Sequence, residues 1–362
     1  MKKILTVLGA RPQFIKASVV STQIADSSSL DEVIVHTGQH FDANMSDVFF
    51  EELGMRTPKY QLNINGGAHG EMTGRMLIEV EKVVLSERPD IVLVYGDTNS
   101  TLAGALVASK LHIPVAHVEA GLRSRNLKMP EEINRILTDR ISTWLFTPTE
   151  SATKNLLQEG VSETAIYQVG DVMYDVALQH GAKVSPHGGI LEQLRLNPKQ
   201  YILVTIHRAE NTDNDTVLRR IVEALSSTAN SIMPIVWPVH PRTKGRLESL
   251  GLLESISADV LLVDPVGYLD MVQLEKHSSL VVTDSGGVQK EAFFHGVPCV
   301  TLREETEWVE LVEAGWNQLM PPTSDVETIR TAMRHAIKKS PIVVFPYGNG
   351  SAAHEIIKEL EA

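Results

Sequence analysis

The sequence predicts an α/β fold made of two doubly wound domains, each built on a parallel sheet. Three observations predict it: short apolar runs rich in β-branched residues recur along the chain, helix-period segments lie between them, and the alternation breaks once near the middle. Strand–helix–strand alternation is typical of doubly wound α/β layers. A chain of 362 residues is also long enough for two domains of ordinary size.

The expected strands are apolar throughout and do not alternate between apolar and polar residues. Continuous apolar character indicates strands that are buried on both faces, as in a parallel sheet. The runs are residues 4–8, 33–36, 91–95, 115–118, 145–147 and 166–169, followed by 202–206, 235–239, 260–263, 280–283 and 299–302. Each half of the chain therefore has the strands for a sheet of its own.

Helix-period segments connect the expected strands, for example at 71–86, 131–143 and 215–229. The break at 174–199 is rich in proline and glycine and weakly periodic, which is typical of an interdomain region. We therefore expect a first domain over residues 1–170 and a second over 171–350, with a last helix in 351–362 that packs back on the first. Ligands of such domains bind at the carboxyl ends of the strands.

The composition excludes several classes of function. Charged residues make up 22% of the chain and the net charge is −12, without a dense Lys/Arg run, so nucleic acid is not an expected partner. A bound phosphate must then rely on local donors such as helix N-termini. No run approaches the about 18 apolar residues of a membrane span, and the apolar start is too short for a signal peptide. We expect a cytoplasmic protein.

Cofactor-binding patterns are absent from the sequence. There is no GxGxxG fingerprint, no HExxH motif and no cysteine cluster, so we expect neither a redox cofactor nor a metal. The single cysteine, Cys299, cannot form an internal disulfide, which fits a reducing compartment. It lies in an apolar run, and we expect a buried strand residue there and not a catalytic thiol.

The first informative motif is the segment 9–16, GARPQFIK, directly after a strand. Gly9 permits a tight turn, and Pro12 suits the first turn of a helix. Arg11 and Lys16 then lie near a helix N-terminus, where the dipole disfavours cations. They are expected either to contact a phosphate or carboxylate or to be exposed to solvent.

Two acidic residues directly follow buried strands in the first half. After 91–95 comes Asp97, and either this residue or Thr98 caps the next helix, or Asp97 is a catalytic carboxylate. After 115–118 comes Glu119. Packing rarely needs a carboxylate at a strand end, because a buried carboxylate requires partners, so we expect Glu119 to be functional.

A third acidic residue, Glu131, opens a helix. Pro130 is the expected first helical residue, which puts Glu131 in the first turn, where the dipole stabilises anions. Arg135 follows four residues later on the same face. Glu131 is therefore either a helix-start acid in a surface pair or an ionised base that projects into the cleft.

Possible phosphate ligands gather in the second half. His207 and Arg208 come directly after the strand at 202–206, and His240 has the equivalent place after the next strand. A lone histidine is more often a hydrogen-bonded structural residue, but two at successive strand ends make binding of a leaving phosphate an equal alternative.

The segment 284–291 reads as a turn followed by a helix. Ser285, Gly286 and Gly287 expose backbone N–H groups at the helix N-terminus, which is a ready site for a diphosphate. Glu291, one turn later, is expected to accept hydrogen bonds from ribose hydroxyls. Carboxylates in the first half and phosphate ligands in the second fit a nucleotide held by one domain while its attached group reacts against the other.

In this order, from GARP (9–12) to PYGNG (346–350), the motifs resemble the non-hydrolysing UDP-N-acetylglucosamine 2-epimerases over almost the whole chain. The resemblance implies two Rossmann-like domains of the GT-B type that face a central cleft, a homodimer, and no cofactor. It also implies a reaction: the C2 proton is removed while UDP leaves C1, and UDP adds back to the 2-acetamidoglucal with a proton on the opposite face.

The resemblance also assigns roles, position by position. The residues implied for catalysis, through proton transfer and charge stabilisation, are Asp97, Glu119, Glu131 and His207. The residues implied for binding of the UDP-sugar are Arg11, Lys16, Arg135, Arg208, His240, Ser285, Gly286, Gly287 and Glu291. Within these two sets, the resemblance implies that the charge of the departing diphosphate is stabilised by His207, Arg208, Arg11 and Lys16.

Within the family, the segments 9–16, 207–213 (HRAENTD) and 306–310 (TEWVE) look like the branch that acts on UDP-2,3-diacetamido-2,3-dideoxy-glucuronate for bacterial lipopolysaccharide O-antigen. A C6 carboxylate needs an additional cation, and Arg125 and Arg242 are candidates by charge. The alternatives are an epimerase of UDP-N-acetylglucosamine that gives UDP-N-acetylmannosamine, a GT-B glycosyltransferase, a hydrolysing epimerase and a non-catalytic UDP-sugar sensor. Solvent deuterium at C2 separates an epimerase from a transferase.

Overall fold

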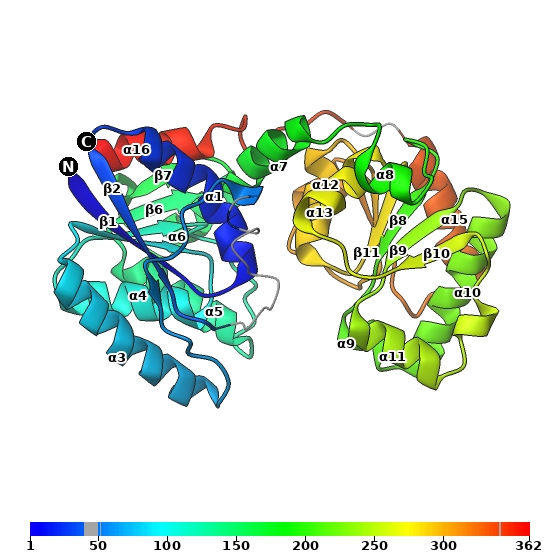
Figure 1. The fold of residues 1–362 in the computed structure, drawn as a ribbon, viewed down its shortest axis with the longest axis horizontal. Helices are drawn as coiled ribbons and strands as arrows, with labels where there is room; N and C mark the ends of the chain where they lie inside the picture. Colours follow the sequence, from blue (N-terminus) through cyan, green and yellow to red (C-terminus); the bar gives the residue numbers. More distant parts are fainter. Residues whose placement is uncertain (40–49, 51, 340–341) are drawn as a thin grey trace. The chain divides into compact units, whose positions relative to one another are not determined.

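The computed structural model describes residues 1–39, 50, 52–339 and 342–362. They form two compact units, one of Met1–Val176 with Phe345–Ala362 and one of Ala177–Val344. Each unit contains one parallel sheet with helices packed against it (Figure 1). The predicted α/β class with two parallel sheets is therefore confirmed.

The sheet of the first unit has the strand order β3-β2-β1-β4-β5-β6-β7, and every neighbouring pair is parallel. Its central strands are buried along nearly their whole length because helices cover both faces. The strands are β1 (Lys2–Leu8), β2 (Leu30–His36), β3 (Tyr60–Gln61), β4 (Ile91–Tyr95), β5 (Val115–Val118), β6 (Trp144–Thr147) and β7 (Ile166–Gln168).

The helices of the first unit include the C-terminal one. They are α1 (Arg11–Asp26), α3 (His69–Glu87), α4 (Asn99–Lys110), α5 (Pro130–Ile141), α6 (Glu150–Gln158), the 3-10 turn η1 (Glu163–Ala165) and α16 (Ala352–Glu361). In Figure 1, α16 lies beside α1, and the two helices are in contact. The C-terminal helix therefore belongs to the first unit and packs against the first helix of the chain.

Polar contacts fix both ends of α16. The Asp175 carboxylate accepts from the backbone N–H groups of Ala352 and Ala353 at 3.2 and 2.8 Å, which satisfies two donors at the N-terminus of the helix. At the other end, Lys2 Nζ donates to the carbonyl oxygens of Leu360 and Glu361, each at 3.2 Å. The last helix is thereby tied to the first strand.

The sheet of the second unit has the order β10-β9-β8-β11-β12-β13, again parallel throughout. Its core combines strand residues with the apolar face of helix α10 (Asp215–Ser231) and includes the fully buried Trp237. The strands are β8 (Ile202–Thr205), β9 (Ile235–Pro238), β10 (Val260–Val263), β11 (Leu280–Thr283), β12 (Cys299–Thr301) and β13 (Asn317–Leu319).

Some helices of the second unit begin at a polar cap, namely at Asn214, His240 and Asp325. Asn214 caps α10, for example, and accepts from the N–H groups of Thr216 and Val217. The elements are α8 (Gly189–Gln193), α9 (Ala209–Thr212), α10 (Asp215–Ser231), α11 (Pro241–Ser249), η2 (Leu253–Ser255), α12 (Tyr268–His277), α13 (Gly286–Phe294), α14 (Val309–Glu313) and α15 (Val326–Lys338).

The division between the units falls between Val176 and Ala177, inside helix α7 (Val172–Lys183). The expected irregular segment 174–199 is thus partly helical. All eleven expected strands are present, and β3 and β13 are added at the sheet edges. Cys299 is buried in β12 as predicted, and burial raises the pKa of its thiol to about 12.

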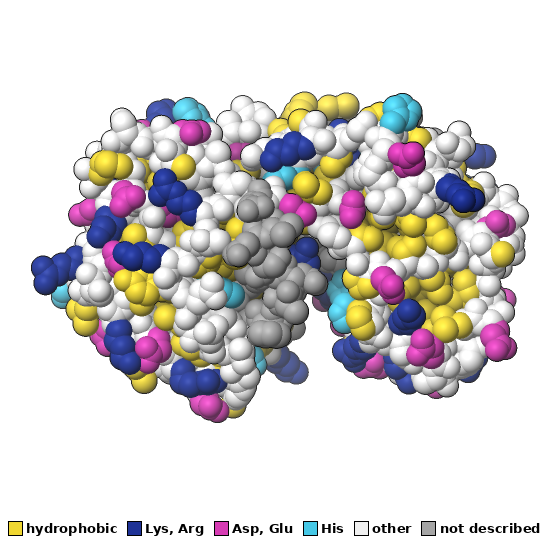
Figure 2. Space-filling model, in the orientation of Figure 1, with side chains coloured by type: hydrophobic (Ala, Val, Ile, Leu, Met, Phe, Trp, Pro, Cys, Tyr) yellow, Lys and Arg dark blue, Asp and Glu magenta, His cyan; other side chains and the backbone are white. Residues whose placement is uncertain are grey.

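Acidic and basic side chains are interspersed on the face of each unit drawn in Figure 2. Among the described residues, no helix combines the length and the apolar character needed to cross a bilayer.

Candidate active site

The carboxyl ends of two adjacent strands carry Asp97 and Glu119. β4 and β5 are neighbours, and the Gly96 N–H donates to the Val118 carbonyl at 3.0 Å, so the two strand ends lie together. Gly96 has a φ of +64°, and a Cβ built there would lie 3.3 Å from Glu119 Oε2. Glycine at 96 therefore suits both the turn and the close approach of the carboxylate.

Glu119 itself adopts a left-handed backbone, with φ of +69°, and is only 6% exposed. A residue with a Cβ pays of order 1–3 kcal/mol for such a conformation, which persists only where the surroundings fix it. Backbone strain of this kind is concentrated at functional sites. At Glu119 the strained backbone orients a buried carboxylate at the end of β5.

Lys16 on α1 is the partner of Glu119. Its Nζ lies 2.5 Å from Glu119 Oε2. Burial lowers the pKa of Lys16, but the contact with Glu119 outweighs burial, and the pKa is raised, with smaller contributions from Asp97 and Asp171. Lys16 is therefore a fixed cation among acidic side chains, and the structure places it against a carboxylate of its own unit.

Asp97 is held by Arg135, not used as a helix cap. Thr98 is the N-cap of α4 and accepts from the Thr101 N–H, which settles the alternative between Asp97 and Thr98. The Asp97 carboxylate instead receives a hydrogen bond from Arg135 at 2.6 Å. Arg135 also donates to Glu132 at 2.9 Å, so its partners in the structure are Asp97 and Glu132, and the surface pair with Glu131 is not the arrangement found.

Glu132 connects the segment before α5 to the pair of Asp97 and Arg135. Its carboxylate is 1% exposed and accepts from the backbone N–H groups of Ser124 and Arg125 at 2.9 and 2.8 Å. Burial alone would raise the pKa of Glu132, but these bonds and the one from Arg135 lower it. α5 begins at Pro130 as predicted, and Glu131 is half-buried in its first turn, next to this ionised anchor.

A layer of buried, hydrogen-bonded side chains supports the turns after β4 and β5, and the sequence analysis does not predict it. His117 Nδ1 lies 2.7 Å from Asp139 Oδ1, and its Nε2 lies 2.7 Å from the Gly96 carbonyl oxygen. Asp139 also pairs with Arg123 at 2.7 Å and accepts from the Gly121 N–H at 3.1 Å. This layer spans both turns that carry Asp97 and Glu119. The only signal in the sequence was a histidine inside an apolar strand, beside Glu119.

The turn after β1 is held by Gln13. Its Oε1 accepts from the N–H groups of Gly9 and Ala10, and its Nε2 donates to the Tyr95 carbonyl at 2.7 Å. A Cβ at Gly9 would lie 1.9 Å from Ser100 Oγ, so close packing requires glycine there. This turn connects the end of β4 to the start of α1, where Arg11 is the first helical residue and is half-buried.

In the second unit, Asp284 organises the segment after β8. Its buried carboxylate accepts from the backbone N–H groups of His207 and Arg208, at 3.1 and 3.0 Å, and from Asn211 Nδ2 at 2.9 Å. His207 Nδ1 also lies 3.5 Å from Asp284 Oδ1. Sequence reasoning missed this role, although Asp284 directly precedes Ser285. Its carboxylate joins the His207–Arg208 turn to the start of α13.

The N-terminus of α13 lies where the sequence predicts it. Ser285 is the N-cap residue, and Gly286 is the first helical residue. Trp308 Nε1 donates to the Gly286 carbonyl at 2.9 Å, and Lys290 Nζ lies 4.3 Å from the centre of the Trp308 ring. The first turn is thus braced from the 306–310 segment, and its backbone N–H groups form the donor set that a diphosphate needs.

The two remaining predicted ligands have partners within the second unit. His240 is exposed and is the N-cap of α11, and its Nδ1 accepts from the Arg242 N–H at 3.2 Å. This is the structural alternative named above for a lone histidine. Glu291 lies on α13 in contact with the carboxyl group of Glu275, a buried residue of α12.

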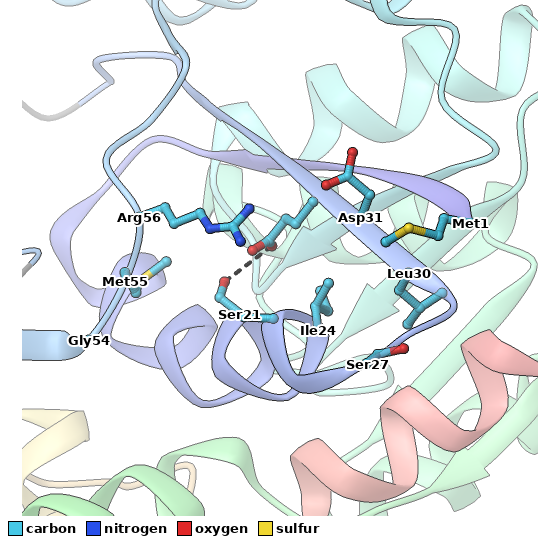
Figure 3. Close-up of a pocket in the computed structure, with 11 residues that line it drawn as sticks. Met1, Ser21, Ile24, Ser27, Leu30, Asp31, Gly54, Met55 and Arg56 are labelled. Atoms are coloured by element: carbon cyan, nitrogen blue, oxygen red, sulfur yellow. Dashed lines mark hydrogen bonds between the residues drawn. The ribbon is translucent and has the colours of Figure 1, made fainter.

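A pocket of the first unit lies elsewhere. It is formed by α1, β2 and the segment 54–56, near Met1 and Leu30 at the amino ends of the strands, whereas the site residues follow the carboxyl ends. In Figure 3 the dashed line marks the hydrogen bond from Ser21 to Glu32 in this pocket. Over the described part of the chain, no three His, Cys, Asp or Glu side chains cluster as metal ligands.

Comparisons with known proteins agree over nearly the whole chain. The family model of UDP-N-acetylglucosamine 2-epimerase matches residues 22–361. The chain is 56% identical to the UDP-2,3-diacetamido-2,3-dideoxy-D-glucuronate 2-epimerase of Pseudomonas aeruginosa, over 99% of both proteins.

Solved structures give the same result. The Methanocaldococcus jannaschii UDP-GlcNAc 2-epimerase, in complex with UDP-GlcNAc and UDP, is 46% identical with a TM-score of 0.86, over 99% of both chains. The Neisseria meningitidis UDP-GlcNAc 2-epimerase, bound to UDP-GlcNAc, is 31% identical with a TM-score of 0.84, over 99% of both chains. The fold is thus the GT-B-like one that the sequence predicts. The chain therefore belongs to the UDP-N-acetylglucosamine 2-epimerase family and is a UDP-sugar 2-epimerase.

Proposed function

We propose that this enzyme inverts C2 of UDP-2,3-diacetamido-2,3-dideoxy-glucuronate, from the gluco to the manno epimer. The observation that carries the proposal is a sequence identity. The chain is 56% identical, over nearly its full length, to a relative named as the 2-epimerase of this substrate, and 46% identical to the M. jannaschii UDP-N-acetylglucosamine 2-epimerase. The TEWVE segment at 306–310 supports it, because it resembles the branch of the family that acts on this substrate. The product would supply the O-antigen of a bacterial lipopolysaccharide.

The reaction proceeds by anti elimination and syn re-addition. A carboxylate takes the C2 proton, the C1–O bond to UDP breaks with its electron pair leaving on the diphosphate, and a C1=C2 double bond forms. UDP then adds back to C1 of the 2-acetamidoglucal while C2 receives a proton on its other face. Asp97, Glu119 and Glu131 carry these proton transfers and stabilise positive charge at C1.

Two features of the first unit suit these roles. Arg135 lies 2.6 Å from Asp97 and Lys16 lies 2.5 Å from Glu119, so a fixed cation faces each of the two carboxylates. Glu131 lies in the first turn of α5, a place where an acidic side chain complements the helix dipole. One of these carboxyl groups must be ionised to take the C2 proton, and another must carry the proton that C2 receives on its other face.

The second unit supplies the charge stabilisation for UDP. His207 and Arg208 lie on a turn that Asp284 holds by three hydrogen bonds, so their side chains are positioned before the diphosphate departs. The first turn of α13, with Ser285, Gly286 and Gly287, offers its N–H groups to the phosphates. Arg11, of the first unit, is the remaining diphosphate ligand in this proposal.

Arg125 is our choice for the cation that recognises the C6 carboxylate. Arg242 pairs with Asp213 at 2.6 Å, whereas the guanidinium of Arg125 donates only to the neutral amide of Asn155, at 3.4 Å, among the described residues. The backbone of Arg125 is left-handed, with φ of +59°, and is anchored by Glu132.

Proton NMR in D₂O tests the reaction and the substrate. The uronate and UDP-N-acetylglucosamine are each incubated with the enzyme alone, and deuterium at C2 is followed together with the manno product. We expect exchange and epimerisation of the uronate to exceed those of UDP-N-acetylglucosamine by about tenfold or more. Equal turnover of both would refute the substrate, and the absence of exchange with either would refute the reaction. Arg125→Gln should reduce the preference, and Arg242→Gln should leave it unchanged.

The three carboxylates are tested as neutral amides. Asp97→Asn, Glu119→Gln and Glu131→Gln should each slow C2 exchange by roughly 10²-fold or more, because a positioned acid or base contributes that much. Glu150→Gln is the matched control, since this glutamate lies on the surface of the same unit and is 72% exposed. Wild-type exchange rates in all three amide variants would refute the proposed mechanism.

A homodimer in the cytoplasm belongs to the same proposal. It rests on the family resemblance, and size-exclusion chromatography with light scattering tests the dimer. A monomeric mass at working concentrations would contradict it.

A further inference from the structure

The turn that carries Asp97 is held by side chains at three successive carbonyl groups. The carbonyl oxygens of Tyr95, Gly96 and Asp97 lie 2.7, 2.7 and 2.9 Å from side-chain nitrogens of Gln13, His117 and Asn134, respectively. These three side chains come from α1, β5 and α5. Because the backbone is fixed at three successive peptides, the Asp97 side chain extends from a set position.

His117 also connects this turn to a second one. It is fully buried in β5, and its Nδ1 lies 2.7 Å from Asp139 Oδ1. The other carboxylate oxygen of Asp139 accepts from the Gly121 N–H at 3.1 Å, in the turn that carries Glu119. The imidazole and Asp139 therefore hold the turn of Asp97 and the turn of Glu119 together.

The geometry determines which ring nitrogens of His117 carry protons. A carbonyl oxygen can only accept, so the contact of Nε2 with the Gly96 carbonyl requires a proton on Nε2. A proton must also lie between Nδ1 and Asp139, because a bare nitrogen would repel a carboxylate oxygen at 2.7 Å. Arg123, whose other acidic partner is Glu159, lies 2.7 Å from the second oxygen of Asp139 and favours its anion. His117 therefore donates from both nitrogens.

We propose that His117 is a positioning residue: through the hydrogen bond from its Nε2 to the Gly96 carbonyl it fixes the peptide that leads into Asp97 and holds the Asp97 carboxylate in its reacting position. The inference rests on the proposed function, in which Asp97 acts on the sugar. Arg135 fixes the other end of the side chain, at 2.6 Å from the carboxylate. Both ends need support, because a misplacement of about 1 Å can cost about 10²-fold in rate.

Two substitutions separate the two ring nitrogens. The amide nitrogen of a glutamine reaches about as far as Nε2, whereas that of an asparagine reaches about as far as Nδ1. His117→Gln therefore keeps a donor toward Gly96, and His117→Asn loses it while keeping a donor toward Asp139. His112→Asn is the matched control, because His112 is exposed in the same unit and asparagine tolerates its left-handed backbone, with φ of +59°.

Each full-length variant is assayed for C2 exchange in D₂O at saturating uronate and for UDP binding by calorimetry. We expect His117→Asn to lower the exchange rate per folded molecule by about tenfold to a hundredfold, because the carboxylate is misplaced. The Kd of UDP should stay unchanged, since the second unit supplies most of the proposed UDP ligands. His117→Gln and His112→Asn should exchange at close to the wild-type rate. A purely structural role would lower Tm and spare the rate of the folded molecules.

The outcomes separate this inference from the proposed function. A wild-type rate in His117→Asn, beside a slow Asp97→Asn enzyme, would overturn the positioning role alone. Equal losses in His117→Asn and His117→Gln would also overturn it, because the bond to Gly96 would then not matter. A wild-type rate in Asp97→Asn would instead remove the role of Asp97 on which the inference rests.

A measurement on the wild type decides the matter if His117→Asn does not fold. Nitrogen NMR of the histidine-labelled enzyme reports the protons on the imidazole rings, and the signals of His117 are assigned by their loss in His117→Gln. We expect a proton on each ring nitrogen of His117. A bare Nε2 would contradict the hydrogen bond to Gly96 and with it the proposal.

Discussion

Asp284→Asn tests the link between the His207–Arg208 turn and the start of α13, the two segments of the second unit that we propose bind UDP. The substitution preserves shape but removes the charge that receives three hydrogen bonds, from the His207 and Arg208 N–H groups and from Asn211 Nδ2. Bonds to a charged acceptor contribute about 1.5–3 kcal/mol and neutral ones about 0.5–1.5 kcal/mol, so each bond loses about 1 kcal/mol. For three bonds the expected destabilisation of this unit is about 3 kcal/mol.

Thermal unfolding measures this loss. In a unit of this length, 1 kcal/mol shifts Tm by about 2–4 °C, so the variant should melt about 6–12 °C lower. Tryptophan fluorescence follows the unit, because Trp237, Trp308 and Trp316 belong to it and Trp237 is buried. The affinity for UDP should fall in parallel, because the His207–Arg208 turn loses its anchor.

The control is Asp264→Asn, an exposed carboxylate of the same unit that pairs loosely with Lys244 at 3.4 Å. It should leave both Tm and UDP binding unchanged. An Asp284→Asn protein that melts within about 2 °C of the wild type and binds UDP normally would refute the argument that Asp284 organises the turn.

Three further outcomes follow from single side chains. Hydrogen bonds from Lys59 and Tyr60 lower the pKa of Glu87 from 4.5 to about 2, so Glu87 stabilises the fold above pH 4.5 and this contribution is lost as pH falls toward 2. Glu87→Gln should therefore melt about 2–4 °C lower at pH 7 and converge with the wild type near pH 2, as acid titrations of Tm would show. Ser285→Ala should weaken UDP binding with little change in Tm, because the Ser285 hydroxyl makes no capping bond within the described residues; an unchanged Kd in calorimetry contradicts its role. Cys299 should resist iodoacetamide in the folded protein and react after unfolding, as mass spectrometry would detect, because its thiol is buried and its pKa is about 12.

The fold could be predicted because its strands are buried on both faces. Such strands need apolar residues at every position, and that pattern survives in the sequence without knowledge of partners. β3 and β13 escaped prediction because they are edge strands of two and three residues, and one of them contains Asn317 and Gln318. Pairing with a neighbour, not local composition, makes these residues strands.

The sequence predicts the candidate site residues that directly follow strands, but not the residues that hold them in place. Asp97, Glu119 and Ser285 follow strands, and that place alone marks them in a doubly wound fold. Their supports are distant in sequence: Asp139 lies 22 residues from His117, and Asp284 lies 77 residues from His207. Such contacts exist only after the chain has folded, so no local pattern reveals them. The resemblance to a family implies roles for the residues that follow the strands, but none for Asp139 and Asp284, which support them.

The placement of α16 has a consequence for synthesis of the protein. A ribosome synthesises the whole of Ala177–Val344 before it makes Phe345–Ala362. Until then α1 lacks the helix that packs on it, and Asp175 lacks the N–H groups of Ala352 and Ala353. The unit that is translated first is therefore the one completed last. A premature stop codon near the 3′ end of the message would damage the first unit, which carries Asp97 and Glu119, and would leave the second unit complete.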